Sequence, residues 1–254
     1  MWFHHELKGK GYEAALTGVA VADNVTGPYQ YINSFRLNPK VWAKNFTVKQ
    51  QKKGFQKHDD KMKISQKAIE GHLMCRDFES GQMSRDMTLF VDDDQTGYHI
   101  TASEQNQTLL ISKLSDDYLS VTTDYVRVFP GETNEAPAIF KKDGKYYMFS
   151  SYTTGWRPNP CRLAVSDNMM SGWKALENPC RGTAEEKKTT FHSQSTYILP
   201  VVGKKNAFIY VGDRWKPENH IEGPYVILPV EFENGIPFLQ WYDSWSLDIF
   251  DKKK

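Results

Sequence analysis

The sequence lacks the features that mark several large classes of protein. Its three cysteines in 254 residues, Cys75, Cys161 and Cys180, cannot form a fully paired disulfide framework, and none has the CxxC spacing of a metal site. No apolar run approaches the roughly 20 residues of a membrane span, and the opening MWFHHELKGK lacks a signal-peptide pattern. Because 32 basic residues balance 31 acidic ones, the net charge of +1 gives no case for nucleic acid as the main partner.

Helix-length apolar periodicity is also scarce, and a repeat of short strands stands in its place. Three stretches, which start near Asp86, Ala136 and Ser195, each open with an apolar strand, turn at Gly or Asp, and continue through three further strands. Phe90 and Phe140 hold matching places in the first two stretches and are 50 residues apart. Four strands every 40–50 residues or so are typical of propeller blades. The sequence therefore predicts an all-β fold, a β-propeller, with an irregular β-sandwich as the alternative.

Turn residues and the first 35 residues support the same prediction. Asp143-Gly144 and Asn234-Gly235 are strong hairpin signals between apolar strands. The segments MWFHHEL, GVAVADN and YQYINSF read as strands two, three and four of a further blade whose first strand is missing. The only modest helix candidate is Ser65–Met74.

A Lys-rich segment, at about residues 40–82, interrupts the repeat. It carries eight lysines between Lys44 and Lys67 and few strand formers. We expect a solvated excursion between blades, inserted into a single propeller domain that spans residues 1–254. The alternative is that Trp42, Phe46 and Phe55 form one wall of a sugar-binding groove.

Three polar residues occupy equivalent places, just before the innermost strand of their repeats: Asp86, Glu135 and Gln194. Inner strands of a propeller converge on its central channel, so three polar residues in register favour a shared axial site. Two carboxylates in one pocket suit glycoside cleavage, with Glu135 as the acid and Asp86 as the charge that raises its pKa. Sugars also need flat apolar platforms, for which the candidates are Tyr12, Tyr152, Trp156, Trp215 and Trp241.

The motifs SRDMTLFVDDD, NEAPAIFKKDGKYY, TTGW and FHSQST, in this order, resemble those of glycoside hydrolase family 43. The resemblance is greatest to its exo-β-1,3-galactanase-like branch and extends from MWFHHEL to the Trp-rich end. It implies a five-bladed β-propeller that hydrolyses a terminal sugar with inversion, here galactose or a related residue of a plant-type polysaccharide. The expected partner is thus an oligo- or polysaccharide.

Carried over by motif, the resemblance assigns roles to individual residues. Glu135 in NEAP matches the general acid, Asp86 in SRD the carboxylate that orients the acid and tunes its pKa, and Gln194 in SQST an amide that replaces the usual base. The resemblance implies no organic cofactor, and no ligand cluster in the sequence identifies a structural cation on the propeller axis. The further substrate-binding candidates are Tyr12, Glu104 in ASEQN, Thr153, Thr154 and Trp156.

The sequence departs from the family pattern at its start. Three complete repeats and a three-stranded one are present where the family has five blades, and the blade that usually carries the general-base aspartate has no counterpart. We therefore expect an incomplete, N-terminally truncated propeller in which Met1 is an internal methionine, with poor stability and weak or no turnover. The resemblance suggests a secreted or periplasmic protein. The alternatives are a non-catalytic carbohydrate-binding propeller, or an arabinofuranosidase or xylosidase of the same family.

Overall fold

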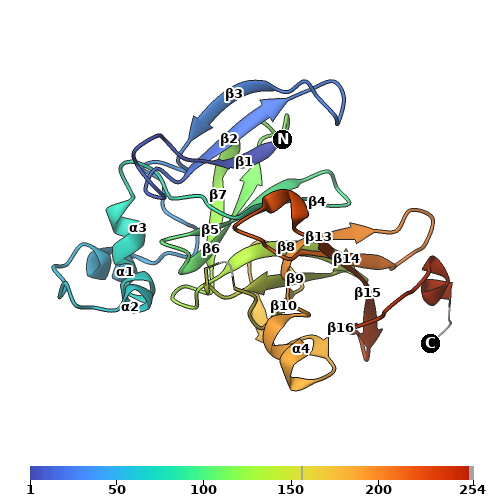
Figure 1. The fold of residues 1–254 in the computed structure, drawn as a ribbon. Helices are drawn as coiled ribbons and strands as arrows, with labels where there is room; N and C mark the ends of the chain where they lie inside the picture. The colour runs from blue at the N-terminus through green and yellow to red at the C-terminus, as the bar shows by residue number, and fades with distance from the viewer. Residues whose placement is uncertain (156, 252–254) are drawn as a thin grey trace. The chain divides into compact units, whose positions relative to one another are not determined.

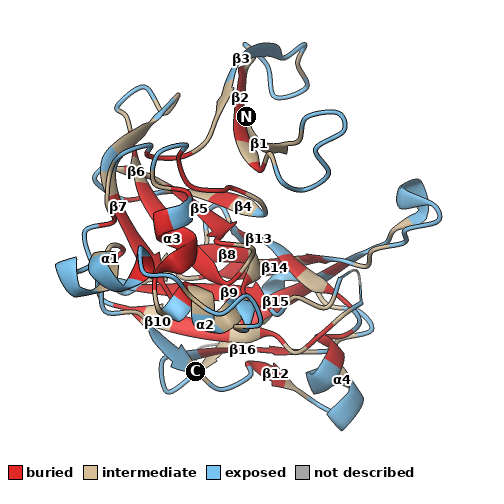
Figure 2. Ribbon diagram, turned by 90° about the vertical axis from the view of Figure 1, so that its left-hand side faces the viewer, coloured by how far each residue is buried: buried red, intermediate tan, exposed pale blue. Residues whose placement is uncertain are grey.

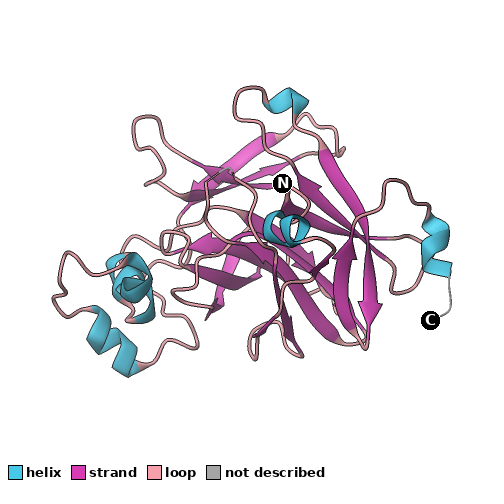
Figure 3. Ribbon diagram, turned by 60° about the horizontal axis from the view of Figure 1, so that its bottom comes forward, coloured by secondary structure: helices cyan, strands magenta, loops and turns pink. Residues whose placement is uncertain are grey.

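The structure is a computed structural model that describes residues 1–155 and 157–251. The chain divides into two compact units, Met1–Glu135 and Ala136–Lys254, which are described separately below. Strands make up most of the regular structure, and the helices are short (Figure 3). This agrees with the prediction of an all-β chain.

Two antiparallel sheets, labelled in Figure 1, form the framework of the first unit. The first has the order β1-β2-β3 and the second the order β4-β5-β6-β7, so each strand pairs with its neighbour in sequence. These sheets correspond to the predicted three-stranded repeat and the first complete repeat. Their strands are β1 (Trp2–His5), β2 (Leu16–Val21), β3 (Gln30–Phe35), β4 (Met87–Val91), β5 (Gly97–Ser103), β6 (Thr108–Leu114) and β7 (Val121–Val128).

The inner strands of the second sheet are buried along most of their length (Figure 2). Ile100 of β5 and Ile111 of β6 face each other in the register and have no exposed surface. β3 has the opposite character, since four of its six residues are exposed. β6 is mostly apolar, whereas β5 also buries the polar residues His99, Thr101 and Ser103.

Three short helices lie in the Lys-rich segment: α1 (Val48–Gly54), α2 (Ile64–Ile69) and α3 (His72–Arg76). Thr47 caps α1 through a reciprocal pair of hydrogen bonds with Gln50. The predicted helix Ser65–Met74 is wrong as one element, because Gly71 has φ 84° and separates α2 from α3. A side chain at Gly71 would also collide with the ring of Phe46.

The apolar residues of this segment form a core with the second sheet. Phe46, Met74 and Cys75 are buried in one cluster with Leu110 of β6 and Tyr125 of β7. The Tyr125 hydroxyl donates a hydrogen bond to the carbonyl of Val41 at 2.6 Å. The expectation of a solvated excursion is therefore wrong for the apolar half of the segment, which the lysine count concealed.

Two further sheets form the second unit, in the orders β11-β10-β9-β8 and β12-β16-β15-β14-β13. The predicted hairpin turns are confirmed: Asp143 and Asn234 have φ 50°, and the glycine after each has φ 79°. The strands are β8 (Glu135–Lys142), β9 (Lys145–Ser151), β10 (Arg162–Ser166), β11 (Lys174–Leu176), β12 (Cys180–Arg181), β13 (Gln194–Pro200), β14 (Phe208–Asp213), β15 (Tyr225–Glu233) and β16 (Ile236–Gln240).

Aromatic and aliphatic side chains from both of these sheets share one core. Phe140 and Phe149 are buried in the same cluster as Tyr210 and Leu228. One α-helix, α4 (Ala184–Thr189), precedes β13 and is capped reciprocally by Thr183 and Glu186. Two short 3-10 helices complete the described elements, η1 (His220–Glu222) and η2 (Leu247–Asp251).

Candidate active site

The first unit brings the two predicted carboxylates into electrostatic contact. Asp86 lies just before β4, where its carbonyl accepts a hydrogen bond from the backbone N–H of Ala102 at 2.8 Å, and Glu135 is the first residue of β8. The side chain of Asp86 is exposed, whereas Glu135 is half-buried. Burial, and after it the negative charge of Asp86, raises the pKa of Glu135 to about 7, against the opposing effects of Arg85 and Asn106.

A carboxyl with this pKa keeps its proton at near-neutral pH, which is what a general acid requires. The predicted cause, the negative charge of Asp86, contributes to this raised pKa, but burial, which was not predicted, is the larger cause. Two carboxylates with separated proton affinities can divide the acid and the charged role between them.

Tyr12 belongs to the same cluster. Arg85 donates hydrogen bonds to the carbonyl of Tyr12 and to the side-chain oxygen of Gln105, each at 2.9 Å. Its guanidinium lies 5.8 Å from the centre of the Tyr12 ring, which is 56% exposed. The exposed ring beside Arg85, the residue before Asp86, is the kind of flat apolar surface on which a sugar stacks.

Glu104 occupies a different environment. It has no exposed surface, and its two carboxylate oxygens accept hydrogen bonds from Arg127 at 2.6 and 2.7 Å. Arg127 also donates to the carbonyl of Ala68 at 2.8 Å. The predicted sugar contact would require a carboxylate with accessible oxygens, and the structure gives Glu104 a supporting role instead.

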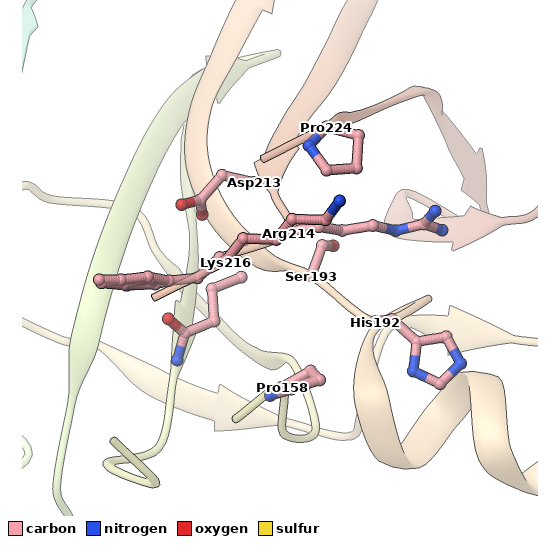
Figure 4. Close-up of a pocket in the computed structure, with 9 residues that line it drawn as sticks. Pro158, His192, Ser193, Asp213, Arg214, Lys216 and Pro224 are labelled. Atoms are coloured by element: carbon pink, nitrogen blue, oxygen red, sulfur yellow. The ribbon is translucent and has the colours of Figure 1, made fainter. Parts of the chain in front are cut away.

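Gln194 lies in the second unit, at the start of β13, and lines a cavity of about 280 Å³. Its amide donates to the hydroxyl of Ser151 at 3.3 Å. The wall also includes Trp215, one of the predicted sugar platforms. Figure 4 shows Asp213 and Arg214 on this wall, with Pro224 and Pro158 at opposite sides of the view.

The TTGW loop is held together by its own polar groups. The hydroxyl of Thr154 donates to the carbonyl of Arg157 at 2.5 Å and accepts from the Asn159 amide at 2.8 Å. Thr153 is half-buried, and Trp156 lies outside the described residues. Pro158 of the same loop lines the cavity with Gln194, so the structure brings this loop and Gln194 together.

Two contributors to these sites were not predicted. Asn106 donates a hydrogen bond to Glu135, and Arg214 borders the Gln194 cavity, with its guanidinium 5.4 Å from the ring centre of Trp241. A signal for Asn106 was present, because Asn is one of the few residues that readily adopts the left-handed conformation of a tight turn. Arg214 has no such local signal, since its place depends on the pairing of β14 with its neighbours.

No group of three or more histidine, cysteine, aspartate or glutamate side chains among residues 1–155 and 157–251 is arranged to hold a metal ion. None of the helices described in the structure has the length and apolar character needed to cross a bilayer.

Comparison with known proteins identifies the family. The model of glycosyl hydrolases family 43 matches residues 70–237, a stretch that contains Asp86, Glu135 and Gln194. The chain belongs to this family. Its members hydrolyse O-glycosyl bonds, and the predicted propeller fold is confirmed by the solved structures below. No curated protein matches the sequence.

Several solved structures of the family are similar over nearly the whole chain. The β-1,3-galactosidase BT3683, in complex with galactodeoxynojirimycin, is 47% identical with a TM-score of 0.90, over 97% of this chain and 72% of that one. The exo-β-1,3-galactanase 1,3Gal43A from Clostridium thermocellum is 32% identical with a TM-score of 0.72, over 96% and 46%. The exo-β-1,3-galactanase from Phanerochaete chrysosporium, with galactose, is 30% identical with a TM-score of 0.68, over 94% and 44%. The chain thus spans less than half the length of the last two.

Proposed function

We propose that this chain acts as a glycoside hydrolase that removes terminal galactose, or a closely related sugar, from a β-1,3-linked galactan with inversion. The observation that carries the proposal is the carboxyl of Glu135, whose pKa is raised to about 7 by burial and by Asp86. The similar structures named as galactosidases and galactanases support galactose over arabinose or xylose. Their similarity over nearly the whole chain also supports one propeller domain.

In the proposed reaction Glu135 transfers its proton to the glycosidic oxygen as the bond from that oxygen to the anomeric carbon breaks. Water attacks the anomeric carbon from the opposite face and passes its proton to solvent, and Glu135 regains a proton from solvent after the leaving group departs. The product is the free sugar with inverted configuration. The negative charge of Asp86 raises the pKa of Glu135 and so helps to keep the proton on the acid until the leaving oxygen takes it.

For Gln194 we propose the role of the amide on the water side. It lines a cavity whose wall includes Trp215, and its orientation is fixed by Ser151. An amide oxygen accepts a hydrogen bond from water but is a weak base. This weakness favours a second candidate, a propeller that binds carbohydrate without turnover.

The experiment combines calorimetry with an assay of galactose release, both with β-1,3-galactotriose. We expect the wild-type chain to bind the trisaccharide and to release galactose slowly, and Glu135→Gln to bind with similar affinity while turnover falls by about 10³-fold. Glu79→Gln, which changes a 75% exposed carboxylate, is the matched control and should behave like the wild type.

Binding without release by the wild type would favour the carbohydrate-binding module. Undiminished turnover by Glu135→Gln would contradict the assignment of the acid.

A further inference from the structure

The turn between β5 and β6 has an unusual backbone. Glu104, Gln105 and Asn106 are consecutive and have φ of 50°, 59° and 61°. Residues other than glycine rarely adopt this left-handed conformation, and three in a row persist only where the surrounding structure holds them. Such strain is often found at functional sites.

Buried contacts hold this turn from both ends. Glu104 is fixed by its two hydrogen bonds from Arg127, whose guanidinium is bonded in turn to the carbonyl of Ala68 at the end of α2. At the other end, the backbone N–H of Asn134 donates to the carbonyl of Asn106 at 2.8 Å. The turn is therefore tied both to the helical segment and to the residue that precedes Glu135.

The result of this arrangement is a short contact to the acid. The Asn106 amide nitrogen donates to Oε1 of Glu135 at 2.6 Å. The other amide atom, Oδ1, is buried and has no hydrogen-bond partner among the described residues. A buried acceptor without a partner is costly, so the bond that the amide nitrogen makes to Glu135 is the contact that this side chain serves.

We propose that Asn106 is a positioning residue for Glu135. Because Oε1 already accepts the amide N–H, the carboxyl proton resides on Oε2, which is thereby the oxygen presented to the leaving group. The left-handed turn and the Glu104–Arg127 pair beneath it hold the amide in place. This inference rests on the proposed role of Glu135 as the acid.

The charged groups around the acid set the expected direction of change. Asp86, before β4, favours the protonated carboxyl, whereas Arg85 and the Asn106 amide favour the ionised one. Glu104 and Arg127 lie behind the turn and neutralise each other. Removal of the Asn106 amide should therefore raise the pKa of Glu135.

Two substitutions separate the amide from the backbone. Asn106→Gly deletes the donor while it relieves the strain of a positive φ, so the turn should fold at least as well as before. Asn106→Asp keeps a residue that tolerates the left-handed conformation but replaces the donor by a second carboxylate. The matched control is Asn234→Gly, at an exposed turn residue with φ 50° in the β15–β16 hairpin.

The first measurement is a titration by NMR of protein labelled with ¹³C at the glutamate carboxyls, with the Glu135 signal assigned by its absence in Glu135→Gln. The second is the pH profile of kcat/KM for galactose release from β-1,3-galactotriose. We expect the pKa of Glu135 to rise by about half a unit to one unit in Asn106→Gly and further in Asn106→Asp, with no change in Asn234→Gly. Turnover at pH 6 should fall about tenfold in both variants, since the acid is no longer oriented.

An unchanged pKa in both variants would overturn the proposal, as would a downward shift, which would mean that the amide accepts from the protonated acid. These outcomes differ from failure of the proposed function. If the pKa of Glu135 shifts as expected but the wild-type protein releases no galactose, the Asn106–Glu135 contact is established and the proposed glycosidase activity is rejected. If the wild-type protein releases galactose but the variants leave the pKa of Glu135 unchanged, only the positioning role of Asn106 is rejected.

Discussion

Two turns of this molecule have the same unusual backbone and differ in chemistry. Glu104–Asn106 and Thr190–His192 are each three consecutive left-handed residues without glycine, and each lies near a residue with a proposed catalytic role. The first delivers an amide donor to Glu135, whose pKa is raised to about 7. The second leads into Gln194, an uncharged side chain. Both turns therefore have a strained backbone, but only the first lies beside a carboxyl whose pKa is shifted.

Two hydrogen bonds to backbone carbonyls hold the second turn. The hydroxyl of Thr190 donates to the carbonyl of Asn159 at 2.6 Å, and Arg214 donates to the carbonyl of Phe191 at 2.9 Å. These bonds shape the wall of the cavity that Gln194 lines. The charged side chains of Asp213, Arg214 and Lys216 lie on the same wall, but the Gln194 amide has no ionisable group for them to tune. The first turn instead rests on a fully buried ion pair. We therefore expect perturbation of the first turn to change stability and pH dependence, and perturbation of the second to change stability alone.

The largest effect is expected from Arg127→Met. It leaves the carboxylate of Glu104 buried without its cation, which should lower the free energy of unfolding by about 3–5 kcal/mol, as measured by urea denaturation. Arg181→Met, which removes a partly exposed ion pair with Glu233, is the matched control and should cost about 1 kcal/mol or less. Equal losses in the two variants would contradict the special status of the buried pair.

A smaller effect is expected from Asp86→Asn, which removes a negative charge beside Glu135. Because that charge raises the pKa of Glu135, its removal should lower this pKa by about one unit. The alkaline limb of the kcat/KM profile should then move to lower pH by the same amount, opposite to the shift expected for Asn106→Gly. Asp93→Asn, on the β4–β5 turn, serves as a control. A limb that stays in place would show that Asp86 does not act on the acid.

The smallest effect is expected from Thr190→Val, at the second turn. It removes one buried hydroxyl and its hydrogen bond to Asn159, so unfolding should become easier by about 1–2 kcal/mol. The pH profile of turnover should match the wild type, because no charge is changed. A shift of the acidic or the alkaline limb of this profile would contradict the proposed difference between the two turns.

The sequence predicted what depends on local chemistry. Asp143-Gly144 and Asn234-Gly235 form the expected turns because few residues other than these adopt positive φ at so little cost. The four-stranded repeats could be predicted as well, because strands joined by short turns pair with their neighbours in sequence. The predicted helix was misplaced because Gly71 breaks it, and α1 was missed although Thr47 and Gln50 form a capping box that can be read from the sequence.

The roles of Glu104 and Asn106 could not be predicted in the same way. Glu104 in ASEQN was a candidate for a sugar contact, but its carboxylate is paired with Arg127 of β7. Asn106 and Glu135, which this hydrogen bond joins, are 29 residues apart in the sequence. Such pairings depend on tertiary structure, and no spacing in the sequence encodes them.

The central claim is that burial and Asp86 keep Glu135 protonated near neutral pH, and a direct titration tests it. NMR of the wild-type protein with ¹³C-labelled glutamate carboxyls reports the pKa of Glu135 independently of activity. A midpoint near 7 for Glu135 is the predicted result. A midpoint near 4.5, the ordinary value for glutamate, would contradict the account.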